Sequence, residues 1–354
     1  IGVSKNADNH TVIFGERQLF LKLLSELRCS QEHPHYLLAT SPNFWASVAV
    51  MTFDDARSRK RATWAWALWD WAEQPFPTIM QTFIFPVYLA GAVAAVGTDS
   101  DSLLGITTGI AGVIVALMAP VFGRRSDESG KRKFWLMVNT YILVAIMIAA
   151  FFVQPKPEFL LFGLVLNGLG SIVQESAFIN YYAMLRQVST PSSIGKVSGY
   201  AWGLGYAGGI ILLCISLFGF ILPGTVFGFE AADSLSVRIT FLFSAVWFAL
   251  FSIPLFRRVP EIEPKENRKK ETLWDSYIKL WGQLQSLRRQ APDTFKFLIS
   301  SAIYRDGLAG VFTFGAVLGT LAFGFSQTEV ILFGIAANIV AGIGAAVGGR
   351  LDDK

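Results

Sequence analysis

The stretch Val197–Ile221 has the sequence V-S-G-Y-A-W-G-L-G-Y-A-G-G-I-I-L-L-C-I-S-L-F-G-F-I, and it contains no charged side chain. A helix of about 20 predominantly apolar residues spans the hydrocarbon core of a bilayer. This stretch therefore predicts a transmembrane helix. Other stretches share its composition, and together they predict eight transmembrane helices, at about 66–96, 103–122, 134–153, 159–183, 197–221, 238–256, 295–323 and 328–348.

The overall composition agrees with an all-α polytopic membrane protein. Of the 354 residues, 53% are hydrophobic and 16% are charged, whereas a soluble domain carries about 25% charged residues. The two cysteines lie far apart, and the three histidines all precede the first predicted span. We therefore expect no disulfide framework, no metal site, no cofactor and no histidine proton relay within the membrane.

Lysine and arginine predict the orientation of the helices. They cluster before the first span (57–61), between spans two and three (124–133) and between spans four and five, whereas the opposite side carries only Lys156 and Arg238. Because cytoplasmic loops are enriched in these residues, we expect a cytoplasmic N-terminus. Topology explains every basic cluster, so no nucleic-acid partner is expected. The tryptophans at 64, 66, 69 and 71 predict an aromatic belt at the membrane boundary.

The chain divides into four predicted regions. Residues 1–50 precede the first methionine, Met51, and are expected to be a non-native or cytosolic leader. Residues 51–256 form a six-helix N-terminal half, 257–294 a linker, and 295–354 the start of a second half. Leu273, Leu280 and Leu287 follow one another at intervals of seven in the linker. They predict an amphipathic helix, lying either on the cytoplasmic membrane surface or in solvent.

The loop between spans two and three has the sequence G-R-R-S-D-E-S-G-K-R-K, from Gly123 to Lys133. Gly123 and Gly130 predict two tight turns, because glycine tolerates backbone conformations that other residues avoid. Asp127 can accept hydrogen bonds from free helix amides. Lys131 and Arg132, with Lys133, hold the loop at the cytoplasmic face.

A shorter copy of this pattern, G-G-R-L-D-D-K, follows the eighth predicted span and contains Gly348 and Asp352. The two copies resemble the loop signature of the major facilitator superfamily. The stretches W-A-L-W-D-W-A (66–72), S-G-Y-A-W-G-L-G-Y-A-G-G (198–209) and Y-R-D-G (304–307) resemble the autophagy-related vacuolar amino-acid effluxer group and its bacterial relatives. Glu73-Gln74 departs from the smaller polar pair of that group, which puts the substrate in question.

The resemblance implies a major facilitator fold of two six-helix halves and a gating role for the two loop copies. The chain ends within the second copy, so we expect it to hold the first half and only two helices of the second. Such a chain is not expected to complete an alternating-access cycle by itself.

Five acidic or basic residues lie beyond the first two positions of the predicted spans: Asp70, Glu73, Glu175, Arg305 and Asp306. A charge at the bilayer centre costs about 2.5–3.5 kcal/mol. The five residues must therefore form pairs, bind protons or face a water-filled cavity. The spacing of Asp70 and Glu73 puts both on one face of their helix.

Two further polar stripes accompany these residues. Span four carries Asn167, Ser171, Gln174 and Glu175 on one side, and span seven carries Ser301, Tyr304, Arg305 and Asp306. The resemblance implies that spans one, four and seven line one central cavity, which would bring the three stripes together.

We expect Arg305 to bind a substrate carboxylate, because a guanidinium can do so bidentately. Glu175 is the first candidate for proton coupling and Asp306 the second. Two alternatives stay open: Arg305 pairs permanently with Glu175 or Asp70, or Asp70 and Glu73 form a gate near the cytoplasmic end of span one.

These observations predict a secondary active transporter that exports amino acids or another small solute and is coupled to protons. The expected partners are a small-molecule substrate and the lipid bilayer, with no obligate protein partner. We expect a bacterial plasma membrane location, or a vacuolar membrane in a eukaryote. A membrane-embedded lipid-modifying enzyme and a channel are the competing classes, but the spans show no nucleophile elbow, paired-metal cluster or pore-loop filter. The chain is therefore not expected to be an enzyme.

Overall fold

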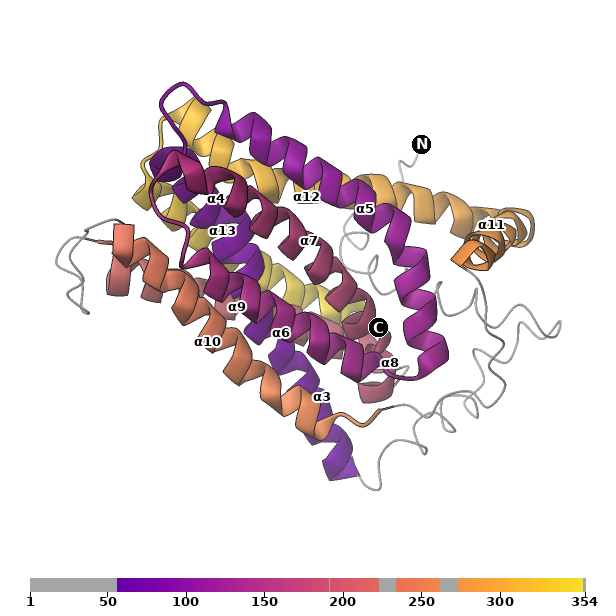
Figure 1. Cartoon of the computed structure of the whole chain (residues 1–354). Helices are drawn as coiled ribbons and strands as arrows, with labels where there is room; N and C mark the ends of the chain where they lie inside the picture. Colours follow the sequence, from indigo (N-terminus) through magenta and orange to yellow (C-terminus); the bar gives the residue numbers. More distant parts are fainter. Residues whose placement is uncertain (1–55, 191, 223–233, 262–272, 353–354) are drawn as a thin grey trace, which may run out of the picture.

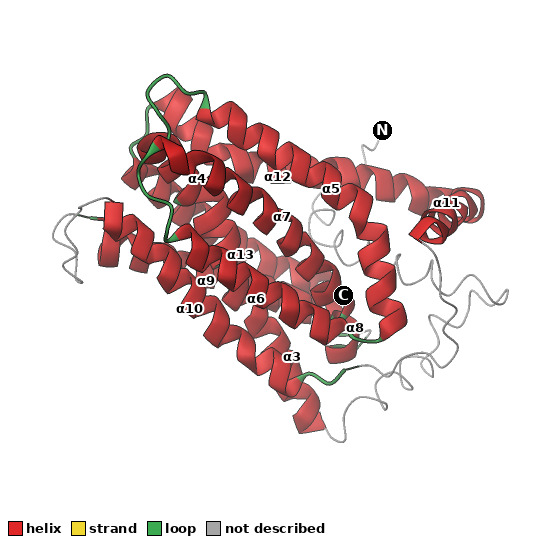
Figure 2. Cartoon of the chain, in the orientation of Figure 1, coloured by secondary structure: helices red, strands yellow, loops and turns green. Residues whose placement is uncertain are grey.

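The computed structural model describes residues 56–190, 192–222, 234–261 and 273–352. Every regular element among these residues is a helix (Figure 2). Seven helical stretches are long and apolar enough to cross a membrane: Arg57–Val93, Ser102–Gly123, Arg132–Ala150, Pro157–Val188, Ile194–Ile221, Leu235–Arg258 and Thr328–Leu351. The predicted all-α polytopic membrane fold is thus confirmed. The expected leader at 1–50 lies outside the described residues.

The first span changes its hydrogen-bonding pattern midway. It begins as α3 (Ala56–Glu73) and continues as the π-helix η1 (Pro75–Phe83), the short α4 (Phe85–Tyr88) and the π-helix η2 (Leu89–Val93). Proline lacks a backbone N–H, so Pro75 interrupts the regular α-helical ladder. The change therefore occurs at a proline.

The helices of the first half pack on one another in pairs. Figure 1 shows α6, α7 and α10 running beside one another. The helix α3 packs on α9 and α10, α6 on α7 and α10, and α5 on α7. The bounds of these elements are α5 (Ser100–Ser129), α6 (Arg132–Ala150), η3 (Pro157–Phe159), α7 (Leu160–Ala183), α8 (Leu185–Val188), α9 (Ile194–Cys214), η4 (Ile215–Ile221) and α10 (Leu235–Arg258).

Three helices follow: α11 (Leu273–Gln290), α12 (Pro292–Phe323) and α13 (Gln327–Asp352). The helix α11 occupies the predicted amphipathic linker, and it contacts α5 and α12. The helix α12 covers the seventh predicted span, and several of its side chains lie outside the described residues. It carries Lys296, Arg305 and Asp306 within its length. The helix α13 packs along α9.

Two of the four tryptophans predicted to form an aromatic belt lie in the core instead. Trp66 and Trp69 are fully buried, and their rings lie 4.4 and 4.5 Å from the ring of Tyr181. Trp69 Nε1 donates to Thr140 Oγ1 at 3.2 Å, and Trp66 Nε1 donates to the carbonyl of Tyr181. Buried acceptors for the indole N–H groups allow this burial. Trp64, in contrast, is 59% exposed.

The loop after α5 turns later than predicted. The helix continues through Gly123 to Ser129, so the expected turn at Gly123 is wrong. The turn comes at Gly130, whose φ of 69° is left-handed and favours glycine, as predicted. Arg132 Nη1 then donates to the carbonyl of Ala183 at 3.2 Å and ties the loop to the end of α7. The side chain of Asp127 lies outside the described residues.

At the second copy of the loop pattern, Gly348 lies inside α13, which continues to Asp352. The described residues therefore contain no turn at this copy, and the side chain of Asp352 lies outside them. The gating role of both copies stays a prediction.

Candidate functional site

A buried carboxylate lies at the contact between α3 and α7. Glu73 is 3% exposed, and Gln174 Nε2 donates to its Oε2 at 3.1 Å. Gln74 Nε2 approaches the other carboxylate oxygen at 3.4 Å, and Thr78 Oγ1 donates to Gln74 Oε1 at 3.2 Å. We call these four residues the Glu73 network. Hydrogen bonds to both carboxylate oxygens offset part of the cost of burying a charge.

The network lies near the middle of the spans that form it. Gln174 is 17 residues after the start and 14 before the end of the stretch Pro157–Val188. Glu73 is 16 residues after the start and 20 before the end of Arg57–Val93. Both partners are therefore at mid-length. The alternative that Asp70 and Glu73 form a gate near the cytoplasmic end of span one stays a prediction.

Asp70 lies one helical turn before Glu73 and is 5% exposed. Its carboxylate interacts with the hydroxyl of Tyr181, the residue whose ring stacks on Trp66. The Tyr181 hydroxyl also lies 3.3 Å from the carbonyl of Trp66. Asp70 thus interacts with an aromatic residue of the core, whereas Glu73 accepts hydrogen bonds from the side-chain amides of Gln174 and Gln74.

Two glycines of α9 form the opposite wall of the Glu73 network. A Cβ on Gly205 would lie 3.0 Å from Gln74 Nε2, and a Cβ on Gly209 would lie 3.2 Å from Gln74 Oε1. Both distances are tighter than ordinary contacts, so α9 approaches the network only because these positions lack side chains. Gly205 and Gly209 thus permit the close packing of α9 against α3.

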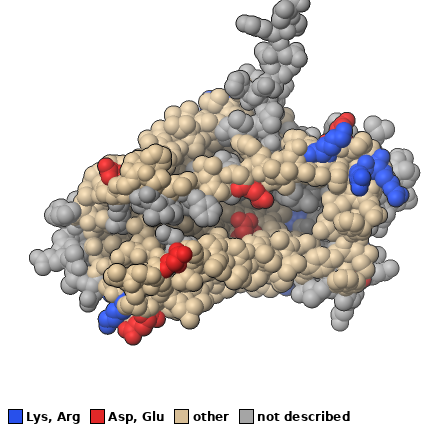
Figure 3. All heavy atoms as spheres, turned by 90° about the horizontal axis from the view of Figure 1, so that it is seen from above, with Lys and Arg blue, Asp and Glu red and all other residues tan. Residues whose placement is uncertain are grey.

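The other predicted site residues lie on α7, a neighbour of η1, and on α12. Asn167 Nδ2 donates to the carbonyl of Met80 at 2.9 Å and fixes the π-helical segment η1. Glu175 is exposed, and so are Tyr304 and Asp306 on α12. The side chain of Arg305 lies outside the described residues. Figure 3 shows a hollow in one face of the molecule, with acidic side chains in and around it.

The structure adds polar residues to the site that sequence reasoning missed. Gln74 bonds to Glu73 and Thr78 bonds to Gln74, and Gln81 Nε2 donates to Ser171 Oγ at 3.0 Å further along the same helices. Asp70, Gln74, Thr78 and Gln81 follow one another at intervals of three and four residues. This helical spacing could have revealed the stripe from the sequence.

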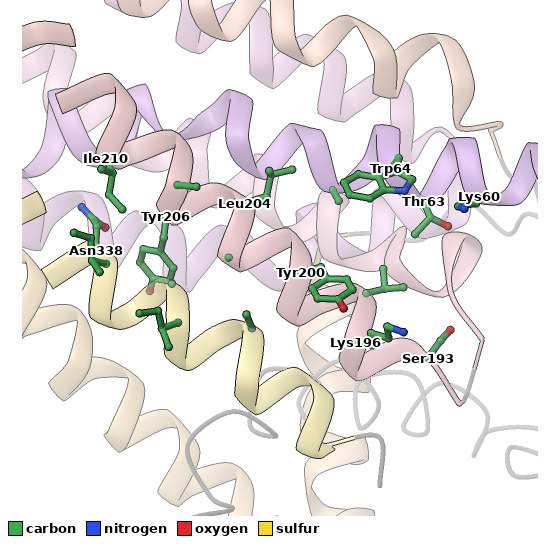
Figure 4. A pocket seen from close by; sticks show the side chains of 18 residues that line it. Lys60, Thr63, Trp64, Ser193, Lys196, Tyr200, Leu204, Tyr206, Ile210 and Asn338 are labelled. Atoms are coloured by element: carbon green, nitrogen blue, oxygen red, sulfur yellow. The ribbon is translucent and has the colours of Figure 1, made fainter. Parts of the chain in front are cut away.

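A second feature is a groove of about 990 Å³ between α3, α9 and α13. Figure 4 shows Lys60, Lys196 and Tyr200 at one end, and Ile210 and Asn338 at the other. We call it the α3–α9–α13 groove. Its far end adjoins the Glu73 network, because a Cβ on Gly209 would lie within 3.9 Å of both Asn338 and Gln74.

Comparison with known proteins supports a transporter. Residues 186–354 match the family described as vacuole effluxer Atg22 like. Over 298 residues the chain is 29% identical to the uncharacterized MFS-type transporter YxiO of Bacillus subtilis (strain 168), covering 82% of this chain and 67% of the relative. These similarities, together with the helical bundle, indicate an MFS-type transporter that resembles the Atg22-like effluxer group.

Proposed function

We propose that this transporter exports amino acids or similar small zwitterions, coupled to protons, with Glu73 as the residue that carries the proton. The observation that supports the proposal most is the burial of Glu73 at mid-span between two amide side chains. The word "effluxer" in the description of the matching family supports the direction.

The environment of Glu73 suits alternate gain and loss of a proton. An ionised carboxylate at the bilayer centre costs about 2.5–3.5 kcal/mol, and a protonated carboxyl avoids that cost. Gln174 and Gln74 can donate to the carboxylate, and an amide oxygen can accept from the protonated form. Small movements of α7 or α9 would therefore change which form is favoured.

Burial favours Glu73 over Glu175 in this role, because the protonation of a buried carboxyl depends strongly on its surroundings, whereas Glu175 is exposed. We propose instead that Glu175, Tyr304 and Asp306 border the solute path. Arg305 remains the proposed partner of a substrate carboxylate, since it is the only arginine near the middle of α12 in the sequence.

The proposed location is a bacterial plasma membrane, with the basic loops at the cytoplasmic face. The bacterial relative and the clustering of Lys131, Arg132 and Lys196 on one side support this orientation.

Uptake by proteoliposomes tests the proposal. The full-length transporter that contains this chain would be reconstituted, a pH gradient imposed, and the uptake of a mixture of labelled amino acids measured. We expect Glu73→Gln to abolish uptake driven by the pH gradient while exchange of substrate across the membrane continues. Glutamine keeps the size and hydrogen bonding of glutamate but carries no exchangeable proton.

Glu158→Gln is the matched control, because Glu158 is exposed in η3 at one end of a span. It should leave uptake unchanged. Gradient-driven uptake by Glu73→Gln at the rate of the unmodified protein would remove Glu73 from the mechanism. The absence of amino-acid uptake by the unmodified protein, with uptake of another solute, would change the substrate class.

A further inference from the structure

The α3–α9–α13 groove has a basic end and an apolar body. Lys60, Lys196 and Tyr200 line its mouth together with Thr63 and Ser193 (Figure 4). Its described lining includes no acidic residue. The body is formed mainly by aliphatic side chains and glycine, with Leu204, Ala207, Ile339, Gly342 and Ile343 among them.

A third cation lies at the same end. Arg350 Nη2 donates to the hydroxyl of Tyr200 at 2.8 Å, and Lys196 Nζ lies 5.9 Å from the centre of the Tyr200 ring. Tyr200 thus contacts a cation from each of two helices, Lys196 of α9 and Arg350 of α13, beside the mouth. This arrangement complements an anionic group.

The length of the groove matches one leaflet of a bilayer. Lys196 and Ile210 lie 14 residues apart on α9, which corresponds to about 21 Å at 1.5 Å per residue. Half of the hydrocarbon core measures about 15 Å, and the headgroup region adds roughly 5–7 Å. A lipid with its headgroup at Lys196 would therefore reach Ile210 with the end of its acyl chain.

The groove is open along this length, since Ile339 is 46% exposed and Ile343 is 63% exposed. Its inner end offers little to a polar solute, because the side-chain amide of Asn338 already donates to the carbonyl of Gly334 at 3.0 Å. Polar recognition is thus concentrated at the mouth.

We propose that the α3–α9–α13 groove binds one anionic phospholipid, with its phosphate at Lys60 and Lys196 and an acyl chain along α9 and α13. The bound lipid occupies the space between the first half of the bundle and α13. Its binding favours the conformation in which α13 stays packed against the first half. The phosphate end of this site is at the opposite end of the groove from the Glu73 network.

Native mass spectrometry of the full-length protein tests the proposal. The protein would be delipidated in a mild detergent and mixed with equal amounts of phosphatidylglycerol and phosphatidylcholine that carry the same acyl chains. We expect preferential retention of one phosphatidylglycerol. A basic residue near an anionic lipid changes binding about fivefold, so Lys60→Gln with Lys196→Gln should weaken retention roughly 30-fold.

Three controls separate a lipid site from loss of structure. Lys156→Gln removes an exposed lysine outside the groove and should change nothing. Lys60→Arg with Lys196→Arg should retain the lipid, because arginine keeps both charges. Ala207→Phe, in the body of the groove, should lower retention, whereas Ile211→Phe, at a 42% exposed position of α9 outside the groove, should not.

Equal retention of the two lipids would overturn the proposal, as would undiminished phosphatidylglycerol binding by the double glutamine variant. Displacement of the lipid by millimolar glycerol phosphate, or normal binding by Ala207→Phe, would show that the mouth binds a phosphate group without an acyl chain. Size-exclusion profiles and helical circular dichroism would verify that each variant is folded.

Discussion

Replacement of Gly199 by alanine should separate α9 from α13. A Cβ at Gly199 would lie 2.8 Å from the carbonyl oxygen of Ala345 and 2.8 Å from Cα of Gly349. Both atoms belong to the backbone and cannot rotate away. Ordinary contact begins at 3.4 Å, so the helices must move apart by about 0.6 Å. A gap of that size forfeits roughly a quarter to a half of each neighbouring dispersion contact.

We therefore expect Gly199→Ala to lower the free energy of unfolding by about 1–3 kcal/mol, as overpacking does in other tightly packed interiors. The assay is the thermal midpoint of the full-length protein in a mild detergent, followed by tryptophan fluorescence. Gly109→Ala on α5 is the control, because a Cβ there meets nothing within 4 Å. It should stabilise the helix by about 0.5–1 kcal/mol. A thermal midpoint for Gly199→Ala as high as that for Gly109→Ala would refute the close approach of α9 and α13.

Three further predictions concern the core and two helix ends. Trp69→Ala should cost about 3–5 kcal/mol of unfolding free energy because its ring is fully buried, and the exposed Trp64→Ala should leave the thermal midpoint nearly unchanged. Gly130→Ala should cost about 1–2 kcal/mol in the same measurement, since φ is 69° at this position. Hydrogen bonds from Ser102 lower the pKa of Asp99 below its ordinary value of 3.8; the start of α5 should therefore be protected in amide exchange at neutral pH and lose protection as the pH falls below that ordinary value. Equal protection at neutral pH and at pH 3 would contradict this cap.

Much of the fold follows from local sequence. The length of each apolar stretch predicts a span, because a helix needs about 20 residues to cross a bilayer. Seven helices of sufficient length and apolarity are found among the described residues. Gly130 predicts the turn after α5, because a left-handed backbone conformation depends on the residue itself. The turn expected at Gly123 is absent because a glycine permits a turn without enforcing one.

The candidate site was only partly predictable. The spacing of Asp70 and Glu73 placed them on one face of α3, and the polar stripe of span four identified the helix that Glu73 contacts. The choice of Gln174 as its partner, with Glu175 exposed, depends on the rotation of α7 about its axis. A rotation of one residue, about 100°, would exchange them.

The sequence alone determined that this chain crosses a membrane and where its helices lie, because hydropathy is a property of short segments. Only the tertiary structure decided that Trp66 and Trp69 lie in the core, that Glu73 meets Gln174 at mid-span, and that α3, α9 and α13 enclose a groove with a basic mouth. Those features depend on the relative depth and rotation of helices distant in the chain, which packing between their surfaces fixes.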